Sequence, residues 1–131
     1  MAAKTWTGEW WVHGGGDNAW HGFTYDLQRP PPAAPPPLKA DFAVDNTLAH
    51  AGAMIYGRCG GCHGPGAIAG GMAPDLRASA VITRTDSFGR IVRDGARAVR
   101  GMPAYADLTD QELRALQHYI RQQANRALPK P

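Results

Sequence analysis

The sequence has 131 residues but only two cysteines, Cys59 and Cys62. Two thiols cannot form the disulfide framework that stabilises small secreted domains. A structural zinc site would need two more ligands of cysteine or histidine type. Apart from His63, which directly follows Cys62, the histidines are His13, His21, His50 and His118. No two of them are spaced as a pair of zinc ligands. The two cysteines therefore indicate a chemical role rather than a structural cross-link.

Long apolar runs are also missing. No stretch approaches the roughly 20 apolar residues that a membrane-spanning helix needs. Residues 1–6 do not have the charged-then-apolar pattern that opens a signal peptide. We therefore expect neither a transmembrane segment nor a secretion signal in this chain. The apolar fraction of 44% with 19% charged residues is nevertheless enough for a globular core, which argues against wholesale disorder.

Aromatic residues and prolines are concentrated near the N-terminus. All four tryptophans lie within residues 1–20, and six of the eleven prolines lie within residues 30–37. Aromatic residues around a glycine run are typical of strands and turns, and consecutive prolines favour an extended spacer. We predict a non-globular or short β segment over 1–28, a proline-rich linker over 29–40 and the folded domain over 41–128.

The remaining segment has the hydrophobic spacing of helices. A first helix, capped by Asp45 or Asn46, is predicted to run into Cys59, because apolar and small residues recur along one face. Its expected inward positions are Leu48, Ala51, Gly52, Ile55, Tyr56 and Cys59. A short helix is predicted from about Asp86 through Asp94 and is ended by Gly95.

The last helix has the strongest boundary signals. Thr109 and Glu112 form a T-x-x-E capping box, and Leu108 and Leu113 are spaced for a hydrophobic staple. A buried face continues from there to a stop near Leu128. The three helices predict an all-α domain, and the Gly- and Pro-rich loops between them indicate that something other than side chains fills its centre.

The segment Cys59-Gly60-Gly61-Cys62-His63 has the C-x-x-C-H pattern by which c-type haem is attached. Two thiols three residues apart at the end of a helix can reach both vinyl groups on one edge of the porphyrin. The adjacent His63 is then held under the iron. The same pattern also occurs in redox-active dithiols and in half of a zinc site, but a thioredoxin-like dithiol needs a βαβ context that is missing here.

A c-type haem with histidine on one side often has methionine on the other. Met102 follows His63 by 39 residues and stands between Gly101, which permits close approach, and Pro103, which stiffens the loop. Met72 follows His63 by only nine residues, a short span for reaching the opposite face of the ring. We predict His63 and Met102 as the axial ligands and expect core packing for Met72. Met54, on the first predicted helix, is also expected to pack in the core.

A histidine that binds a metal normally donates its other ring N–H to a carbonyl group. The loop containing Pro74 and Leu76 begins about ten residues after His63 and is stiffened by the proline. We predict that the Pro74 carbonyl accepts this hydrogen bond. Leu76 is predicted to pack on the edge of the ring, with ordinary core packing as the alternative.

Three further segments carry a specific resemblance. They are Gly70-Gly71-Met72-Ala73-Pro74-Asp75-Leu76-Arg77, Ile91-Val92-Arg93-Asp94-Gly95-Ala96 and Gly101-Met102-Pro103-Ala104-Tyr105. Over roughly residues 45–127 the sequence resembles the C-terminal cytochrome c domain of quinohaemoprotein alcohol dehydrogenases. The resemblance implies a class I type cytochrome c fold, with three main helices around one covalent haem c. It also implies Cys59 and Cys62 as thioether anchors and His63 and Met102 as axial ligands.

The N-terminal segment extends this resemblance. Gly14-Gly15-Gly16-Asp17-Asn18-Ala19-Trp20 is similar to part of a blade of the pyrroloquinoline quinone (PQQ) propeller in the same enzymes, whose site takes PQQ and Ca²⁺. In that family the tryptophan matching Trp20 forms the floor under the quinone. The other blades have no counterpart here. We therefore expect residues 1–28 to be a propeller remnant in which Trp20 holds no PQQ.

These observations predict one-electron transfer. Electrons would pass from a quinoprotein dehydrogenase centre through the haem to an external redox protein or quinone, without catalysis by this chain on its own. Two alternatives are a subunit of a PQQ-dependent alcohol dehydrogenase that is active only with a supplied propeller, and a non-haem C-x-x-C redox module. Because haem is attached to C-x-x-C-H on the oxidising side of a bacterial membrane, the expected location is the periplasm.

Positive charge is concentrated just before Met102. Six arginines lie between Arg77 and Arg100, against only two aspartates, Asp86 and Asp94. A solvated surface is the ordinary interpretation of such a run. The alternatives are steering of an acidic partner toward the haem edge and pairing with a haem propionate. No aromatic interleaving or groove-reading element accompanies these arginines, so we do not expect nucleic-acid binding.

Overall fold

The computed structural model of the chain describes residues 37–129. This part contains four α-helices and no strand, which confirms the predicted all-α architecture. The α-helices are α1 (Asn46–Ile55), α2 (Gly57–His63), α3 (Thr85–Val92) and α4 (Asp110–Ala127). Short 3₁₀ helices lie between them: η3 (Pro65–Ala67), η4 (Leu76–Ala78), η5 (Ala80–Thr83) and η6 (Ala98–Arg100). The predicted propeller remnant, with Trp20, and most of the predicted linker lie outside the described residues.

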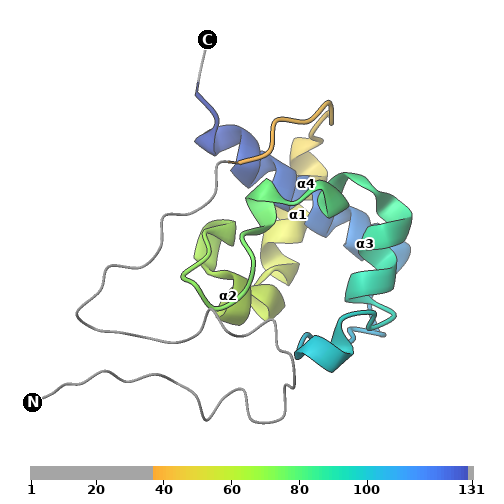
Figure 1. The fold of residues 1–131 in the computed structure, drawn as a ribbon. Helices are drawn as coiled ribbons and strands as arrows, with labels where there is room; N and C mark the ends of the chain where they lie inside the picture. Colours follow the sequence, from red (N-terminus) through yellow and green to blue (C-terminus); the bar gives the residue numbers. More distant parts are fainter. Residues whose placement is uncertain (1–36, 130–131) are drawn as a thin grey trace, which may run out of the picture.

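Helices α1 and α4 cross at the centre of the domain, and α2 and α3 lie on either side of the crossing in the view of Figure 1. Within residues 37–129 no helix has the length and apolar character required to cross a membrane. The apolar core is drawn from α3, α4 and the segments between the helices, and the partly buried Ile55 of α1 and Cys59 of α2 pack against it. Its buried members are Tyr56, Ala67, Ile82, Phe88, Val92, Leu108, Leu113, Leu116 and Ile120.

Helix α1 begins at the predicted cap. The Asp45 carboxylate accepts hydrogen bonds from the amides of Thr47 at 2.8 Å and Leu48 at 3.1 Å. Ala49, Gly52 and Tyr56 are buried, and the predicted inward residue Ala51 is exposed, so that assignment was wrong. Because α1 has small residues on both sides, the sequence does not decide exactly which side faces the core. Packing against α4 decides this.

The single helix predicted to run into Cys59 is instead two helices. Helix α1 ends at Ile55 and α2 starts at Gly57, with a turn at Tyr56 between them. Three of the first five residues of α2 are glycine, which has a low helix propensity and does not hold a helix to one continuous axis. The C-x-x-C-H segment is thus carried on its own short helix, separate from α1.

Helix α4 begins with the predicted capping box. Thr109 Oγ1 accepts from the Glu112 amide at 3.1 Å, and the Glu112 carboxylate accepts from the Thr109 amide at 2.8 Å. The predicted inward residues are all buried; they are Leu113, Leu116, Ile120 and Ala124. The helix ends at Ala127 with Leu128 as its cap, as predicted.

Helix α3 is close to its predicted range, and Phe88 and Val92 are buried on its inner face. The chain then turns at Gly95, where φ is 77°, a value that favours glycine. A Cβ at this position would come within 2.9 Å of the Ala104 Cβ. Gly95 therefore lets the η6 segment fold back against the loop that follows Met102.

Two polar side chains on α4 are fully buried. Gln117 donates to the Ile82 carbonyl at 2.8 Å and so joins α4 to η5. Arg121 has 0% of its surface exposed, and its Nε and Nη1 have no hydrogen-bond partner among the described residues. Burial lowers the pKa of Arg121, because an uncompensated guanidinium is poorly solvated there. We therefore expect an apolar side chain of similar size at this position to be neutral or stabilising.

The crossing of α1 and α4 generates a prediction about glycine. A Cβ on Gly52 would collide with the Ala115 carbonyl and would lie 2.8 Å from the Tyr119 Cβ, whereas a Cβ on Gly57 would meet nothing within 4 Å. We expect Gly52→Ala to lower the free energy of unfolding by about 1–3 kcal/mol. Gly57→Ala is the matched control and should be neutral or stabilising by up to about 1 kcal/mol. Urea unfolding of the holoprotein compares the two, and equal effects would contradict the close approach of the two helices at Gly52.

His118 generates a prediction about pH. Its buried ring lies 4.9 Å from the Phe42 ring, and its Nδ1 accepts the Asp45 amide proton at 2.9 Å. Burial and the Arg114 charge lower the pKa of His118, although the Asp45 charge opposes them. A histidine with a lowered folded-state pKa contributes stability above about pH 6.5 that is lost as pH falls.

The test substitutes an acceptor that does not titrate. In His118→Asn the side-chain carbonyl takes the place of Nδ1. The urea midpoint of the native protein should therefore fall more steeply than that of the variant between about pH 7.5 and about pH 5. Loss of the contact with Phe42 lowers the midpoint of the variant at every pH and leaves this slope unaffected. Equal slopes would show that His118 does not titrate in this range.

Candidate functional site

Helix α2 carries the two cysteines and His63. Cys59 and Cys62 stand three positions apart, so their side chains emerge from the same side of the helix. Both thiols are free, Cys59 half-buried and Cys62 exposed. Burial raises the pKa of the Cys59 thiol, and the nearby Arg58 charge partly opposes this. The helix thus presents two free thiols and one imidazole to a common region.

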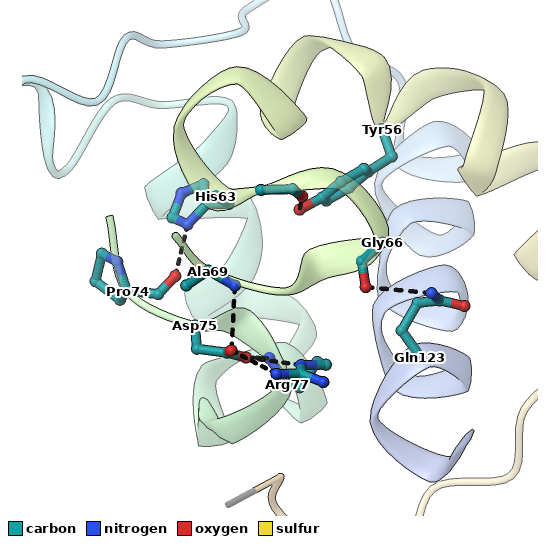
Figure 2. A network of polar contacts seen from close by, with 9 residues as sticks. Tyr56, His63, Gly66, Ala69, Pro74, Asp75, Arg77 and Gln123 are labelled. Atoms are coloured by element: carbon teal, nitrogen blue, oxygen red, sulfur yellow. Dashed lines mark hydrogen bonds and ion pairs between the residues drawn. The ribbon is translucent and has the colours of Figure 1, made fainter. Parts of the chain in front are cut away.

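The His63 ring is buried and fixed by one hydrogen bond. Its Nδ1 lies 2.8 Å from the Pro74 carbonyl oxygen, the partner expected from the sequence (Figure 2). A carbonyl can only accept, so the proton is on Nδ1 and the lone pair of Nε2 remains available. Burial lowers the pKa of His63, although the Pro74 carbonyl and the Asp75 charge oppose it. The ring is therefore a neutral imidazole, the form that binds metals.

The loop from Gly64 to Asp75 is held around His63 by further hydrogen bonds. The Tyr56 hydroxyl donates to the Gly64 carbonyl at 2.8 Å, and the Gln123 amide group donates to the Gly66 carbonyl at 3.1 Å. The Ala69 amide donates to the Asp75 carboxylate at 3.2 Å, closing the loop next to Pro74. In the view of Figure 2 the contact of Gly66 with Gln123 lies to the right of His63, and that of Ala69 with Asp75 lies below it. They fix the position of the Pro74 carbonyl.

Asp75 and Arg77 form a buried ion pair at the base of this loop. Arg77 Nη2 lies 2.7 Å from Asp75 Oδ2, and its Nε and backbone amide each donate to Oδ1 at 3.0 Å. Burial alone raises the pKa of Asp75, but the Arg77 side chain and the two backbone amides outweigh it and hold the pKa below its usual value. Sequence reasoning gave this pair no role. The alternation Pro74-Asp75-Leu76-Arg77, with opposite charges two positions apart, was the available signal.

A cavity of about 330 Å³ lies against α2, within the range of ligand pockets. Both cysteines and His63 line it, together with Pro74 and Leu76. Apolar side chains from η5, α3 and α4 form the rest of its inner wall; they include Val81, Ile82, Phe88, Val92, Leu116 and Ile120. The residues predicted from the sequence to share one site therefore line one cavity.

Two methionines line the same cavity. Met102, half-buried, follows Gly101, whose φ of 97° turns the chain after η6. Met72 is also half-buried and lines the cavity, so it is not simply a core residue. Met54 is 79% exposed, and the expectation that it packs in the core was wrong. It lies on the side of α1 away from the buried Ala49 and Gly52, and it was not among the residues predicted to face inward.

Tyr105 and Arg58 at the cavity rim were not assigned a role from the sequence. Arg58 lies over the Tyr105 ring at 4.7 Å and pairs with Asp107 at 2.7 Å, and the Tyr105 hydroxyl donates to the Arg58 carbonyl at 3.1 Å. These contacts join the residue just before Cys59 to the loop just after Met102. Tyr105 belongs to the segment that carried the family resemblance, which was the signal for it.

Comparison with known proteins identifies the family. Residues 47–120 match the family described as "Cytochrome C oxidase, cbb3-type, subunit III". The chain belongs to this cytochrome c family. The four helices around the α2 cavity are accordingly a cytochrome c fold, and the protein is a haem c protein of the electron-transfer class.

Two of the curated relatives are quinohaemoprotein alcohol dehydrogenases, the family that the sequence resembles. The chain is 39% identical over 97 residues, 69% of its length, to quinohemoprotein alcohol dehydrogenase ADH IIB of Pseudomonas putida. It is 33% identical over 106 residues, 79% of its length, to ADH-IIG of the same species. The dehydrogenase subunit of alcohol dehydrogenase (quinone) from Gluconobacter oxydans (strain 621H) is 32% identical over 91 residues, 68% of the chain. These matches cover only 14%, 14% and 12% of the relatives.

The cavity of this cytochrome c domain fits a haem c. Its wall is mainly apolar, as a porphyrin requires, and two free thiols stand at one side of it. One neutral imidazole has its Nδ1 engaged and its Nε2 available, and two thioether side chains line the same space. Among residues 37–129 no cluster of three or more His, Cys, Asp or Glu side chains is arranged to hold a different metal ion.

The ion pair below His63 generates a prediction. Arg77→Met leaves the Asp75 carboxylate buried without its partner, which should lower the free energy of unfolding by about 3–5 kcal/mol. The double variant Asp75→Asn/Arg77→Met removes both charges and should recover most of this loss. Arg93→Met, which breaks the exposed contact of Arg93 with Asp110 at 2.6 Å, is the control and should cost no more than about 1 kcal/mol. Urea unfolding of each holoprotein measures the differences. If Arg77→Met lowered the free energy of unfolding no more than Arg93→Met does, the structural role of the buried pair would be contradicted.

Proposed function

We propose that this chain is a one-electron carrier in which Cys59 and Cys62 anchor a single haem c and His63 and Met102 are its axial ligands. The observation that supports this most directly is the shared cavity: both thiols, the imidazole with its free Nε2, and Met102 all line it. When bound, haem c supplies an iron that cycles between Fe(II) and Fe(III). Ligation from both sides leaves no open position for a substrate.

The side chains around the cavity have separate tasks in this proposal. The Pro74 carbonyl holds the His63 ring by accepting from Nδ1 at 2.8 Å, and Leu76, which lines the cavity, would pack against the edge of the porphyrin. The apolar wall excludes water, which together with a methionine ligand raises the reduction potential. No proton has to move for electron transfer, and the neutral His63 has none to release at Nε2.

Met102 is proposed over Met72 on grounds of chain geometry. Met72 lies two residues before Pro74, whose carbonyl accepts the hydrogen bond from His63 Nδ1. Met72 and the group that positions His63 therefore lie on one short stretch of chain. Met102 comes from the separate loop after η6, where Gly101 makes the turn and Tyr105 ties the loop to the Arg58 carbonyl. An axial pair must approach the iron from opposite faces, and two independent loops meet that requirement more readily.

We propose that the domain accepts electrons from a quinoprotein dehydrogenase centre and passes them to an external redox protein or quinone. The similarity to quinohaemoprotein alcohol dehydrogenases supports this donor, and PQQ with Ca²⁺ would be the cofactors of that centre. On this proposal residues 41–128 form the electron-transfer domain, 29–40 its linker and 1–28 a segment related to the propeller. The chain alone then performs no catalysis. Its proposed location is the periplasm, because haem is attached to C-x-x-C-H on the oxidising side of a bacterial membrane. The alternative is a dehydrogenase subunit that becomes catalytic when a propeller is supplied.

Haem attachment and ligation are tested together. After expression with haem-maturation machinery, the denatured protein should stain for haem, and Cys59→Ala/Cys62→Ala should not. Met102→Leu should remove the weak methionine-to-iron charge-transfer band of the oxidised protein and lower its reduction potential, because a strong thioether ligand is lost. Met72→Leu is the matched control and should keep both. Loss of the band in Met72→Leu with retention in Met102→Leu would reassign the ligand, and an unstained native protein would disprove the proposal.

A further inference from the structure

The 3₁₀ helix η6 presents two cations and one apolar side chain at the edge of the cavity. Arg97 and Arg100 are exposed and also line the cavity, so they border both solvent and the pocket. Val99, between them in the sequence, is 84% exposed. We call Arg97, Val99 and Arg100 the η6 tip. An apolar residue that exposed, with a guanidinium on either side, has the composition of a small protein contact.

The η6 tip is tied to Met102 by the backbone. Gly95 and Gly101, with φ of 77° and 97°, bracket the turn. Within it the Gly101 amide donates to the Ala98 carbonyl at 3.0 Å, and the Met102 amide donates to the Arg97 carbonyl at 3.3 Å. A partner that touches Val99 is therefore separated from the proposed methionine ligand by only three positions of a hydrogen-bonded turn.

The carboxylates nearest in sequence to the η6 tip are occupied by other arginines. Asp107 pairs with Arg58 at 2.7 Å, and Arg93 contacts both Asp94, at 3.7 Å, and Asp110, at 2.6 Å. Within the described part of the chain, neither arginine of the tip has a carboxylate at ion-pair distance. The tip therefore carries two positive charges that the domain itself does not compensate.

We propose that the η6 tip is the docking surface for a diffusing electron-acceptor protein with an acidic patch. Its carboxylates contact Arg97 and Arg100, and its apolar centre packs on Val99. The inference rests on the proposed electron-transfer function and adds the place and the charge of the partner. In the transfer the acceptor gains one electron, the iron is oxidised from Fe(II) to Fe(III), and no atom or proton is exchanged.

Charge complementarity favours the acceptor over the donor as occupant of the tip. A donor domain joined to the cytochrome by a linker meets it at a high effective concentration and needs no long-range attraction. An acceptor that must find the pocket by diffusion gains association rate from uncompensated charge. The matched region is only 12–14% of each relative, so in those proteins the region similar to this domain is part of a much longer polypeptide.

The location is tested with a redox-inert anion. Hexacyanochromate(III) is a paramagnetic trianion that broadens NMR signals where it binds. In the reduced holoprotein it should broaden the amide signals of residues 97–102 first, and this should be lost in Arg97→Gln/Arg100→Gln. The matched control is Arg84→Gln/Arg114→Gln, which removes two exposed arginines that do not line the cavity and should leave the broadening unchanged. Equal broadening in both double variants would overturn the proposed site.

The rate effect is tested with two small oxidants of opposite charge. At low salt, oxidation by hexacyanoferrate(III) should be about tenfold slower in Arg97→Gln/Arg100→Gln than in the control variant. Oxidation by tris(phenanthroline)cobalt(III), a trication, should become faster instead. Both differences should vanish at about 1 M salt, where the Debye length is about 3 Å. Rates that do not depend on charge and salt in this way would overturn the steering role.

The apolar part of the contact needs a protein probe. Plastocyanin with an acidic surface patch serves as the acceptor, and Val99→Ser should lower its rate of reduction by about fivefold through lost apolar contact. The same variant should leave the hexacyanoferrate(III) rate unchanged, because a small ion does not bury Val99. Equal plastocyanin rates for the native protein and Val99→Ser would overturn Val99 as a docking residue.

Competing explanations give different results. If Arg97 and Arg100 instead hold haem propionates, their double variant should shift the reduction potential and its pH dependence, which a docking surface leaves unchanged. Binding of the native protein, but not of the double variant, to phosphatidylglycerol vesicles at about 0.15 M salt would replace the acceptor protein by a membrane surface. Failure of haem attachment would disprove the electron-transfer function itself. A normal haem spectrum without a response to these probes would disprove only the docking surface.

Discussion

The close approach of α1 and α4 at Gly52 is the constraint on which the rest of the structure depends. With no side chain at Gly52, the helix backbones meet at Ala115, and both helices are then fixed relative to each other. Helix α1 leads directly into α2 and its C-x-x-C-H segment, while α4 supplies Leu116 and Ile120 to the wall of the cavity. The distance between the thiols and the opposite wall of the pocket is therefore set by one helix crossing.

The His63 side and the Met102 side of the pocket are held by different kinds of contact. Around His63 the chain is held by polar contacts, including the Pro74 carbonyl and the buried pair of Asp75 and Arg77. The Met102 side is a tight turn held by backbone hydrogen bonds and two glycine conformations, with exposed side chains beyond it. Rigid support on one side and an accessible turn on the other suit a site that keeps its cofactor and meets partners at one edge.

Local chemistry and the inward face of α4 were readable from the sequence, whereas the end of α1 and the exposure of Ala51 were not. The capping box at Thr109 follows from two side chains and their own backbone, and the Pro74 carbonyl follows from the needs of an imidazole, so both are independent of distant packing. The break at Tyr56 was hidden because apolar and small residues continue at helical spacing into the glycine-rich α2, and the exposure of Ala51 depends on how α1 rests on α4. The burial of Arg121 depends likewise on tertiary contacts, since nothing in its neighbours marks an arginine as interior.

Several polar contacts around His63 join residues close in sequence, whereas the contact of Asp45 with His118 joins the two ends of the domain. Tyr56 to Gly64 spans 8 positions and His63 to Pro74 spans 11, whereas the bond from Asp45 to His118 spans 73. Short loops cost less entropy to close. The two cysteines proposed as thioether anchors, His63 and Pro74 all precede α3, and α4, which comes last, adds the contact of Gln123 with the loop around His63. The order of the chain thus separates attachment of the cofactor from closure of the domain over it, with the final helix completing the wall.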